Sequence, residues 1–169
     1  AQYANFPIAS IESFTALWKE HPNLEGLNVT IPYKKEVIAF LQYSSPVVEA
    51  IKACNCIRKY NNELYGYNTD VIGFEKSLAP FLQPHHTHAL ILGTGGAAVA
   101  VEWVLQKLNI NYLLVSRANA NADSSESGNA ISYDALTTEL LSQYTLIINT
   151  SPVGMYPNVD ELPSLPYAA

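Results

Sequence analysis

The 169-residue sequence predicts an α/β protein, and three observations support that prediction. Apolar residues make up 49% of the chain and charged residues only 14%, a balance typical of a fold with a buried core. Between residues 88 and 150, short apolar runs alternate with helical patterns, as they do in a doubly wound parallel sheet. A glycine-rich turn joins the first of these runs to a helical segment. We expect an N-terminal α/β domain over residues 1–80 and a doubly wound domain over residues 81–169.

In the first domain, turn and capping residues separate short apolar segments. Ser10 is a good N-cap for a helix with apolar residues at helical spacing, and Pro22 ends that helix near His21. Asn61 and Asn62 suit a tight turn between two strands, because asparagine tolerates positive φ. The expected order is a strand over 1–6, the helix after Ser10, a strand over 27–31, a helix over 32–41, a helix over 46–52, strands over 54–60 and 64–67, and a helix from residue 70 to Pro80.

The second domain follows a polar stretch over 84–88, which we interpret as a linker. Its expected elements are strands over 89–92, 112–116 and 146–149, with helices over 99–108 and 133–143 between them. Ser132 is the predicted N-cap of the last helix. Residues 118–129 are small and polar and predict a mobile loop, and the proline-rich tail over 157–169 predicts irregular structure.

The glycine turn has the spacing Gly93-x-Gly95-x-x-Ala98. In a dinucleotide-binding turn the first glycine allows the sharp bend and the second lets a pyrophosphate approach the backbone. The third position must be small so that the helix packs on the strand. The free N–H groups and the positive dipole end of the helix then bind the phosphates. A tight turn without a ligand is the alternative, but the strand and helix on either side favour a dinucleotide site.

A lysine and an aspartate follow two strands of the first domain. Lys34 lies in the first turn after Pro32, where the helix dipole disfavours a cation, so a compensating partner is expected. Asp70 is by itself equally well explained as a first-turn acid of its helix. Because both residues follow strand ends, we expect them to converge at one edge of the sheet and to serve acid/base chemistry on a hydroxyl.

Ser116 and Arg117 follow the second strand of the predicted nucleotide domain. An NAD site places an acidic residue near this position to bind the ribose 2′-hydroxyl, whereas a guanidinium binds a 2′-phosphate. Arg117 therefore favours NADP, with a chance surface arginine as the alternative.

Several other classes of function are disfavoured. The net charge of −6 argues against a nucleic-acid-binding surface. The chain has no apolar run long enough to span a bilayer and does not open on a signal peptide. Cys54 and Cys56 would point to opposite faces of a strand, and the histidines over 85–88 lie in a loop, so we expect neither a disulfide nor a metal site. We expect a cytoplasmic protein without nucleic-acid or membrane partners.

Six segments, in this order along almost the whole chain, resemble motifs of the shikimate dehydrogenase family. They are residues 28–34, Asn55 within 53–56, the Asn-Thr-Asp segment 68–70, the glycine loop 93–97, residues 116–118 and residues 149–155. The resemblance implies an N-terminal substrate-binding domain followed by a Rossmann-type domain that binds NADP. It also implies the reversible NADPH-dependent reduction of 3-dehydroshikimate to shikimate in the chorismate pathway of aromatic amino-acid biosynthesis.

The same resemblance implies roles for individual residues. Lys34 would exchange the proton of the reacting oxygen, and Asp70 would hold the lysine and a substrate hydroxyl. Thr30 and Asn55 would add hydrogen bonds to the substrate. The cofactor would contact Gly93, Thr94, Gly95, Gly96, Ala97, Ser116, Arg117, Thr150 and Met155, with Met155 near the nicotinamide.

The sequence also departs from the family pattern. Cys56 replaces the threonine expected after Asn55, and Asn121 replaces a second arginine, so Arg117 would bind the 2′-phosphate largely alone. The N-terminal Ser-x-Ser segment and the C-terminal part are missing, so we expect a fragment with weak turnover, as a monomer or homodimer.

Three alternatives remain open at this stage. They are an NAD-dependent quinate/shikimate dehydrogenase, a methylenetetrahydrofolate dehydrogenase-like enzyme, which the Asn-Thr-Asp segment disfavours, and a non-catalytic nucleotide-binding module.

Overall fold

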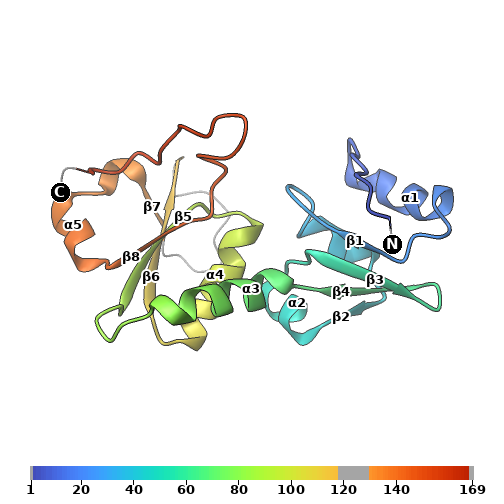
Figure 1. The fold of residues 1–169 in the computed structure, drawn as a ribbon, viewed down its shortest axis with the longest axis horizontal. Coiled ribbons are helices and arrows are strands. Elements are labelled where there is room, and N and C mark those ends of the chain that lie inside the picture. The colour runs from blue at the N-terminus through green and yellow to red at the C-terminus, as the bar shows by residue number, and fades with distance from the viewer. Residues whose placement is uncertain (1, 118–129, 168–169) are drawn as a thin grey trace. The chain divides into compact units, whose positions relative to one another are not determined.

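The structure, a computed structural model, describes residues 2–117 and 130–167 (Figure 1). Its contacts divide the chain into two compact units, residues 1–70 and 71–169. The boundary that the sequence predicts lies after residue 80, so the two divisions differ in where they assign helix α3 (Thr69–Leu78). Phe74 and Leu78 of this helix pack against the core of the second unit, which explains why the contacts group most of α3 with that unit.

The first unit contains a mixed four-stranded sheet with strand order β1-β3-β4-β2. β1 and β4 run antiparallel to β3, and β2 runs parallel to β4. Its elements are a 3₁₀ helix Ile11–Ser13, α1 (Phe14–Glu20), β1 (Gly26–Asn28), a 3₁₀ helix Glu36–Phe40, β2 (Tyr43–Ser44), α2 (Pro46–Ile51), β3 (Cys56–Tyr60), β4 (Glu63–Tyr67) and the start of α3.

Local sequence explains much of this unit. Ser45 caps α2 through its hydroxyl, which accepts a hydrogen bond from the Val48 amide, and Pro46 occupies the first helical position, where its missing N–H costs nothing. Asn61 and Asn62 adopt φ values of 50° and 62° in the turn between β3 and β4, which confirms the predicted turn. The core groups Phe14, Val37, Val48, Cys54 and Ile57.

Two predicted elements of the first unit are wrong. Residues 2–6 form no strand, and within the described chain no backbone hydrogen bond joins them to β1. Residues 32–41 form turns and a 3₁₀ helix rather than an α-helix. The Lys34 carbonyl accepts a hydrogen bond from the Cys54 amide at 2.7 Å, and the Ile38 amide bonds to Lys35 instead of Lys34. A long-range contact therefore takes the acceptor that an α-helix would need.

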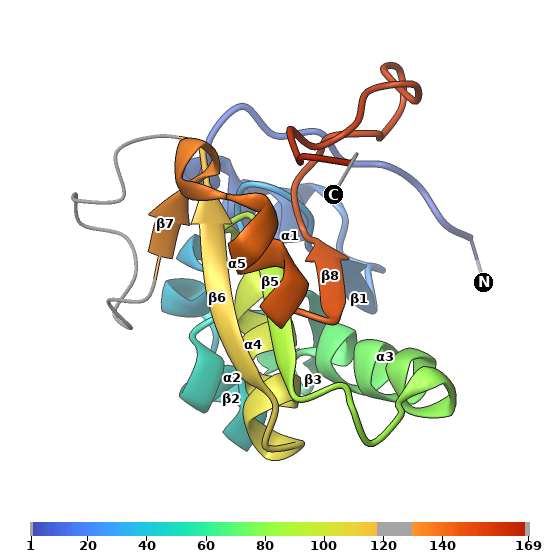
Figure 2. The ribbon, with the colours of Figure 1, turned by 90° about the vertical axis from the view of Figure 1, so that its left-hand side faces the viewer.

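The second unit is a four-stranded parallel sheet with strand order β7-β6-β5-β8. After α3 and a 3₁₀ helix Ala79–Phe81, its elements are β5 (His88–Leu92), α4 (Gly96–Lys107), β6 (Asn111–Ser116), β7 (Ala130–Ser132), a 3₁₀ helix Tyr133–Ala135, α5 (Thr138–Gln143) and β8 (Leu146–Asn149). Helices α4 and α5 lie on opposite faces of this sheet (Figure 2). The predicted doubly wound sheet is therefore confirmed.

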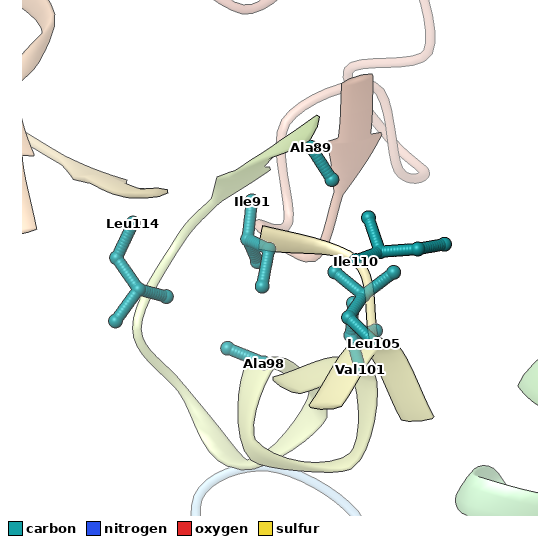
Figure 3. Packing of buried hydrophobic residues seen from close by; sticks show 7 residues of the cluster. All are labelled: Ala89, Ile91, Ala98, Val101, Leu105, Ile110 and Leu114. Carbon is teal, nitrogen blue, oxygen red and sulfur yellow. The ribbon is translucent and has the colours of Figure 1, made fainter. Parts of the chain in front are cut away.

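Strand β5 is buried on both faces, as an inner parallel strand must be. Ala89 and Ile91 point into a cluster with Val101 and Leu105 of α4 (Figure 3). Leu90 and Leu92 point into a second cluster on the α5 side. This two-sided burial explains why residues 89–92 are all apolar.

Two details of the second unit differ from prediction. The predicted helix over 133–143 is a 3₁₀ helix followed by α5, and the residue that caps α5 is Thr137, whose hydroxyl accepts from the Leu140 amide at 3.1 Å. Ser132 forms no such capping bond and is instead the last residue of β7. Strand β7 itself is not among the elements that the sequence predicts. The predicted loop over 118–129 lies outside the described residues.

Replacing Ile91 by alanine is expected to lower the free energy of unfolding of the second unit by about 2–5 kcal/mol, because it leaves a cavity under α4. Ile147, on β8 of the same sheet, is 50% exposed, and Ile147→Ala should cost less than about 1 kcal/mol. Urea unfolding followed by Trp103 fluorescence, in a Trp18→Phe background, measures both. Equal losses for the two variants would contradict the packing described above.

Within residues 2–117 and 130–167, every helix is too short or too polar to span a bilayer.

Candidate functional site

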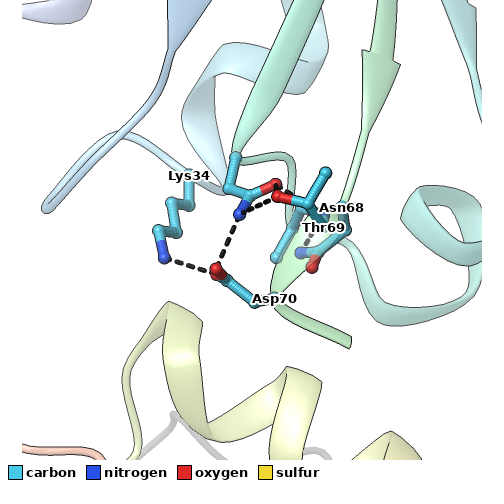
Figure 4. A network of polar contacts seen from close by, with 6 residues as sticks. Lys34, Asn68, Thr69 and Asp70 are labelled. Carbon is cyan, nitrogen blue, oxygen red and sulfur yellow. Dashed lines mark hydrogen bonds and ion pairs between the residues drawn. The ribbon is translucent and has the colours of Figure 1, made fainter. Parts of the chain in front are cut away.

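Lys34 and Asp70 form an ion pair in the first unit, with 2.7 Å between Nζ and Oδ2 (Figure 4). The Lys34 backbone is held by the bond from the Cys54 amide, and Asp70 lies in the first turn of α3. The two side chains are 16% and 36% exposed, so the pair is partly buried and remains reachable by a small molecule. The structure thus brings together the two residues that the sequence singled out for acid/base chemistry.

Asn55, the residue before β3, joins this pair. Its side-chain nitrogen donates to Asp70 Oδ1 at 2.7 Å, while Lys34 donates to Oδ2. Its side-chain oxygen accepts from the Thr69 amide at 2.8 Å and so caps α3 across the fold. Both oxygens of the Asp70 carboxylate therefore have fixed donors, which sets the orientation of the carboxylate.

Asn68 and Thr69 support the network, although the sequence did not single them out individually. Asn68 is 4% exposed and donates to the Ala53 carbonyl at 3.0 Å, which ties the end of β4 to the residues before β3. The Thr69 hydroxyl lies 3.0 Å from the side-chain nitrogen of Asn55. The signal that could have found them is the run of three polar residues between a strand and a helix.

Thr30 is not part of this network. It is exposed, and within the described chain its hydroxyl makes no hydrogen bond, although its carbonyl accepts from the Tyr33 amide. Its predicted role in substrate binding stays a prediction.

The two cysteines lie beside the network as free thiols. Cys54 is fully buried and its thiol donates to the Cys56 carbonyl. Burial raises the pKa of the Cys54 thiol, because the thiolate would lose its hydration. Among the described residues, no cluster of three or more histidine, cysteine, aspartate or glutamate side chains is placed to hold a metal ion.

In the second unit, a tight glycine turn joins β5 to the start of α4. Gly93 has φ of +113°, and a Cβ there would approach the Thr150 hydroxyl to 2.9 Å, so only glycine fits. Gly95 is the N-cap of α4 and has no side chain to satisfy the first N–H groups of the helix. A Cβ at Gly95 would meet no atom within 4 Å, so the space beside Gly95 is open.

The end of β8 lies against this turn. The Thr150 amide and hydroxyl both donate to the Leu92 carbonyl at 2.9 Å. Asn149 braces the segment that follows, by accepting from the Ser151 amide and donating to the Val153 carbonyl. Met155 is 59% exposed at the end of this segment. The chain leaves β5 and β8 at the point where the strand order reverses, which is where open α/β sheets bind ligands.

The remaining predicted cofactor residues occupy the same edge of the sheet. Thr94, Gly96 and Ala97 belong to the glycine turn and the first turn of α4. Ser116 ends β6, and Arg117 follows it with an exposed side chain. Asn121, where a second arginine was expected, lies outside the described residues.

The strand order, the parallel pairing and the glycine turn define the second unit as a Rossmann-type dinucleotide-binding fold. Comparison with known proteins shows what the chain is similar to. Residues 1–57 match the family described as the shikimate dehydrogenase substrate binding domain. The chain is 34% identical to the shikimate dehydrogenase (NADP(+)) of Caldicellulosiruptor saccharolyticus, in an alignment that covers 96% of this chain and 62% of the relative. It is 40% identical to the enzyme of the same name from Syntrophomonas wolfei, over 83% of this chain and 52% of the relative.

Solved structures agree with these matches. Shikimate dehydrogenase 1 from Peptoclostridium difficile superposes with a TM-score of 0.77 at 34% identity, covering 94% of this chain and 59% of that one. Shikimate 5-dehydrogenase from Thermus thermophilus, solved in complex with NADP(H) and shikimate, has a TM-score of 0.76 at 28% identity, covering 95% and 60%. These matches agree with the family that the motifs indicate, and the chain spans 62% of the length of the Caldicellulosiruptor saccharolyticus relative.

Proposed function

We propose that this protein catalyses the reversible NADPH-dependent reduction of 3-dehydroshikimate to shikimate, a step of aromatic amino-acid biosynthesis. The observation that carries the proposal is the Lys34–Asp70–Asn55 network, in a chain whose second unit has the dinucleotide-binding turn. The names of the relatives support both the reaction and the cofactor.

The residues of the second unit fit NADP. The open space at Gly95 and the uncapped start of α4 suit the pyrophosphate, because backbone N–H groups and the helix dipole favour negative charge there. Arg117 supplies a cation at the end of β6, where a 2′-phosphate is bound in folds of this type. When bound, NADPH supplies the hydride.

In the proposed mechanism, Lys34 and Asp70 act on the oxygen atoms of the substrate. As the carbonyl is reduced, Lys34 Nζ donates a proton to the forming alkoxide, and in the reverse direction it accepts that proton. Asp70 keeps the ammonium in place through Oδ2 and has lone pairs left to accept from a substrate hydroxyl. Asn55 fixes the carboxylate and is a candidate for a further hydrogen bond to substrate.

An assay of NADPH formation from NADP⁺ and shikimate tests the proposal, with NAD⁺ and quinate as controls. We expect turnover with NADP⁺ and shikimate, weak in this chain as the sequence predicts. Turnover confined to NAD⁺ or quinate would move the assignment to a quinate/shikimate dehydrogenase that uses NAD. Absence of turnover in a folded protein that still binds nucleotide would favour a non-catalytic module.

A cytoplasmic location, and a monomer or homodimer as the assembly, stay predictions.

A further inference from the structure

Among the described residues, Asn68 is the only buried side chain that carries an amide or a charge, with 4% of its surface exposed. A buried amide costs free energy unless it is hydrogen-bonded. The Asn68 Nδ2 donates to the Ala53 carbonyl at 3.0 Å, although the two residues are 15 positions apart in the sequence (Figure 4). The place of this bond in the fold indicates what the buried amide does.

Ala53 is a fully buried part of residues 52–55, which connect α2 to β3 and form no helix or strand. We call these residues the 52–55 connector. Because a segment without regular structure lacks a ladder of repeating hydrogen bonds, its position depends on individual bonds. Two of them come from the end of β4. One is the bond from Asn68, and the other runs from the Asn55 amide to the Tyr67 carbonyl at 3.1 Å.

The 52–55 connector holds both members of the ion pair in the candidate site. The Cys54 amide donates to the Lys34 carbonyl at 2.7 Å, and the Asn55 Nδ2 donates to Asp70 Oδ1 at 2.7 Å. Lys34 lies in a run of turns, so no helical ladder holds its main chain in place of that bond. A shift of the connector would therefore change the contact between the ammonium and the carboxylate, which are 2.7 Å apart.

We infer that Asn68 is a positioning residue for the proposed reaction. Through the Ala53 carbonyl it fixes the 52–55 connector, and the connector sets the placement of Lys34 relative to Asp70. The inference rests on the proposed function, because it assigns a support to the acid/base pair of that function. Reaction rates respond steeply to such placement, since a misplacement of about 1 Å can cost about 10²-fold.

Steady-state kinetics of the NADP⁺-dependent oxidation of shikimate test the inference. We expect Asn68→Ala to lower kcat about tenfold, because the Ala53 carbonyl loses a buried donor and the connector can shift. KM for NADP⁺ should stay within about twofold, since the glycine turn belongs to the other unit. When Asn68→Ala is combined with Asn55→Ala, the loss should fall short of the product of the two single losses by at least about threefold, as expected for residues in one network.

Reductive methylation of the lysines, mapped by mass spectrometry, follows the same placement without requiring turnover. Lys34 is 16% exposed and bonded to Asp70, whereas Lys35 is exposed, so Lys34 should react more slowly. Asn68→Ala should raise the ratio of the Lys34 rate to the Lys35 rate at least about twofold, because a displaced ammonium loses part of its protection. If Asn68→Ala does not fold, Asn68→Ser takes its place and should change the ratio in the same direction.

Two variants of the first unit serve as matched controls. Gln42→Ala removes a bond between a side chain and the main chain at the other end of β4, where Gln42 Oε1 accepts from the Leu64 amide at 2.8 Å. Leu17→Ala removes a buried side chain of α1 and lowers the melting temperature without removing a side-chain hydrogen bond. Both controls should keep kcat and the ratio of methylation rates within about twofold of the unsubstituted values.

An unchanged kcat together with an unchanged methylation ratio in Asn68→Ala would overturn the inference. Equal effects in Leu17→Ala would do the same, because they would show that a general loss of stability is sufficient. A double variant with Asn55→Ala whose loss equals the product of the single losses would also overturn it. A raised methylation ratio in a folded protein that binds NADP⁺ but does not oxidise shikimate would refute the proposed reaction and leave the placement of Lys34 by Asn68 standing.

Discussion

Replacing Lys34 by alanine is expected to lower kcat for the NADP⁺-dependent oxidation of shikimate by about 10²–10⁴-fold, the usual contribution of a positioned general acid or base. The variant loses the Lys34 amine, which the proposed mechanism assigns to exchange a proton with the reacting oxygen. Asn55 still donates to Asp70 and still accepts from the Thr69 amide at the start of α3. The fold of the first unit should therefore persist. Steady-state kinetics and circular dichroism measure the two effects.

The adjacent residue provides the control. Lys35 is exposed and belongs to the same turn, so Lys35→Ala removes an equal charge without touching Asp70. Its kcat should stay within about twofold of the unsubstituted value, as for most surface changes. NADP⁺ affinity should be unchanged in both variants, because the nucleotide-binding turn belongs to the other unit. Comparable losses of kcat in the two variants would show that the charge of the region matters and that Lys34 has no specific role.

The convergence of Lys34 with Asp70 could be predicted because it follows from strand direction. Each residue follows a strand, and β1 and β4 run in the same direction because both are antiparallel to β3. The dipole of an α-helix at Lys34 is no part of the reason, since residues 32–41 form turns and a 3₁₀ helix. The contact between Asn55 and Asp70 could not be predicted in the same way. It depends on β3 and β4 being antiparallel neighbours whose register pairs Cys56 with Tyr67, which local sequence patterns do not encode.

The wrong prediction of a helix over 32–41 has a similar origin. The apolar spacing of that segment is compatible with an α-helix, but the Cys54 amide takes the Lys34 carbonyl. Likewise the sequence does not predict β7, because its three residues follow a polar stretch and its pairing with β6 depends on the folded sheet. In both segments tertiary hydrogen bonds outweigh local propensity. The strongly periodic parts, such as β5 and α4, were predictable because burial alone determines their pattern.

Replacing Gly95 by aspartate is expected to weaken NADP⁺ binding by about 10²–10³-fold while leaving the second unit folded. The new carboxylate would occupy the open space where the pyrophosphate must lie. Two like charges about 4 Å apart near a protein surface repel by about 4 kcal/mol. The aspartate would also bond to the first N–H groups of α4 and so compete for the donors that the phosphates need.

The same substitution should not destabilise the unit, which is what separates a binding role from a structural one. Gly95 has φ of −82° and ψ of −171°, a conformation that aspartate adopts readily at an N-cap. The carboxylate also interacts favourably with the helix dipole, so the melting temperature should stay constant or rise. Gln106→Glu adds an equal charge near the other end of α4, about 16 Å away along the helix, and should leave NADP⁺ affinity nearly unchanged. A melting temperature that falls together with the affinity would show that Gly95 is needed for the turn itself. Unaltered affinity in a stable Gly95→Asp protein would place the phosphates elsewhere and remove the basis for the nucleotide site.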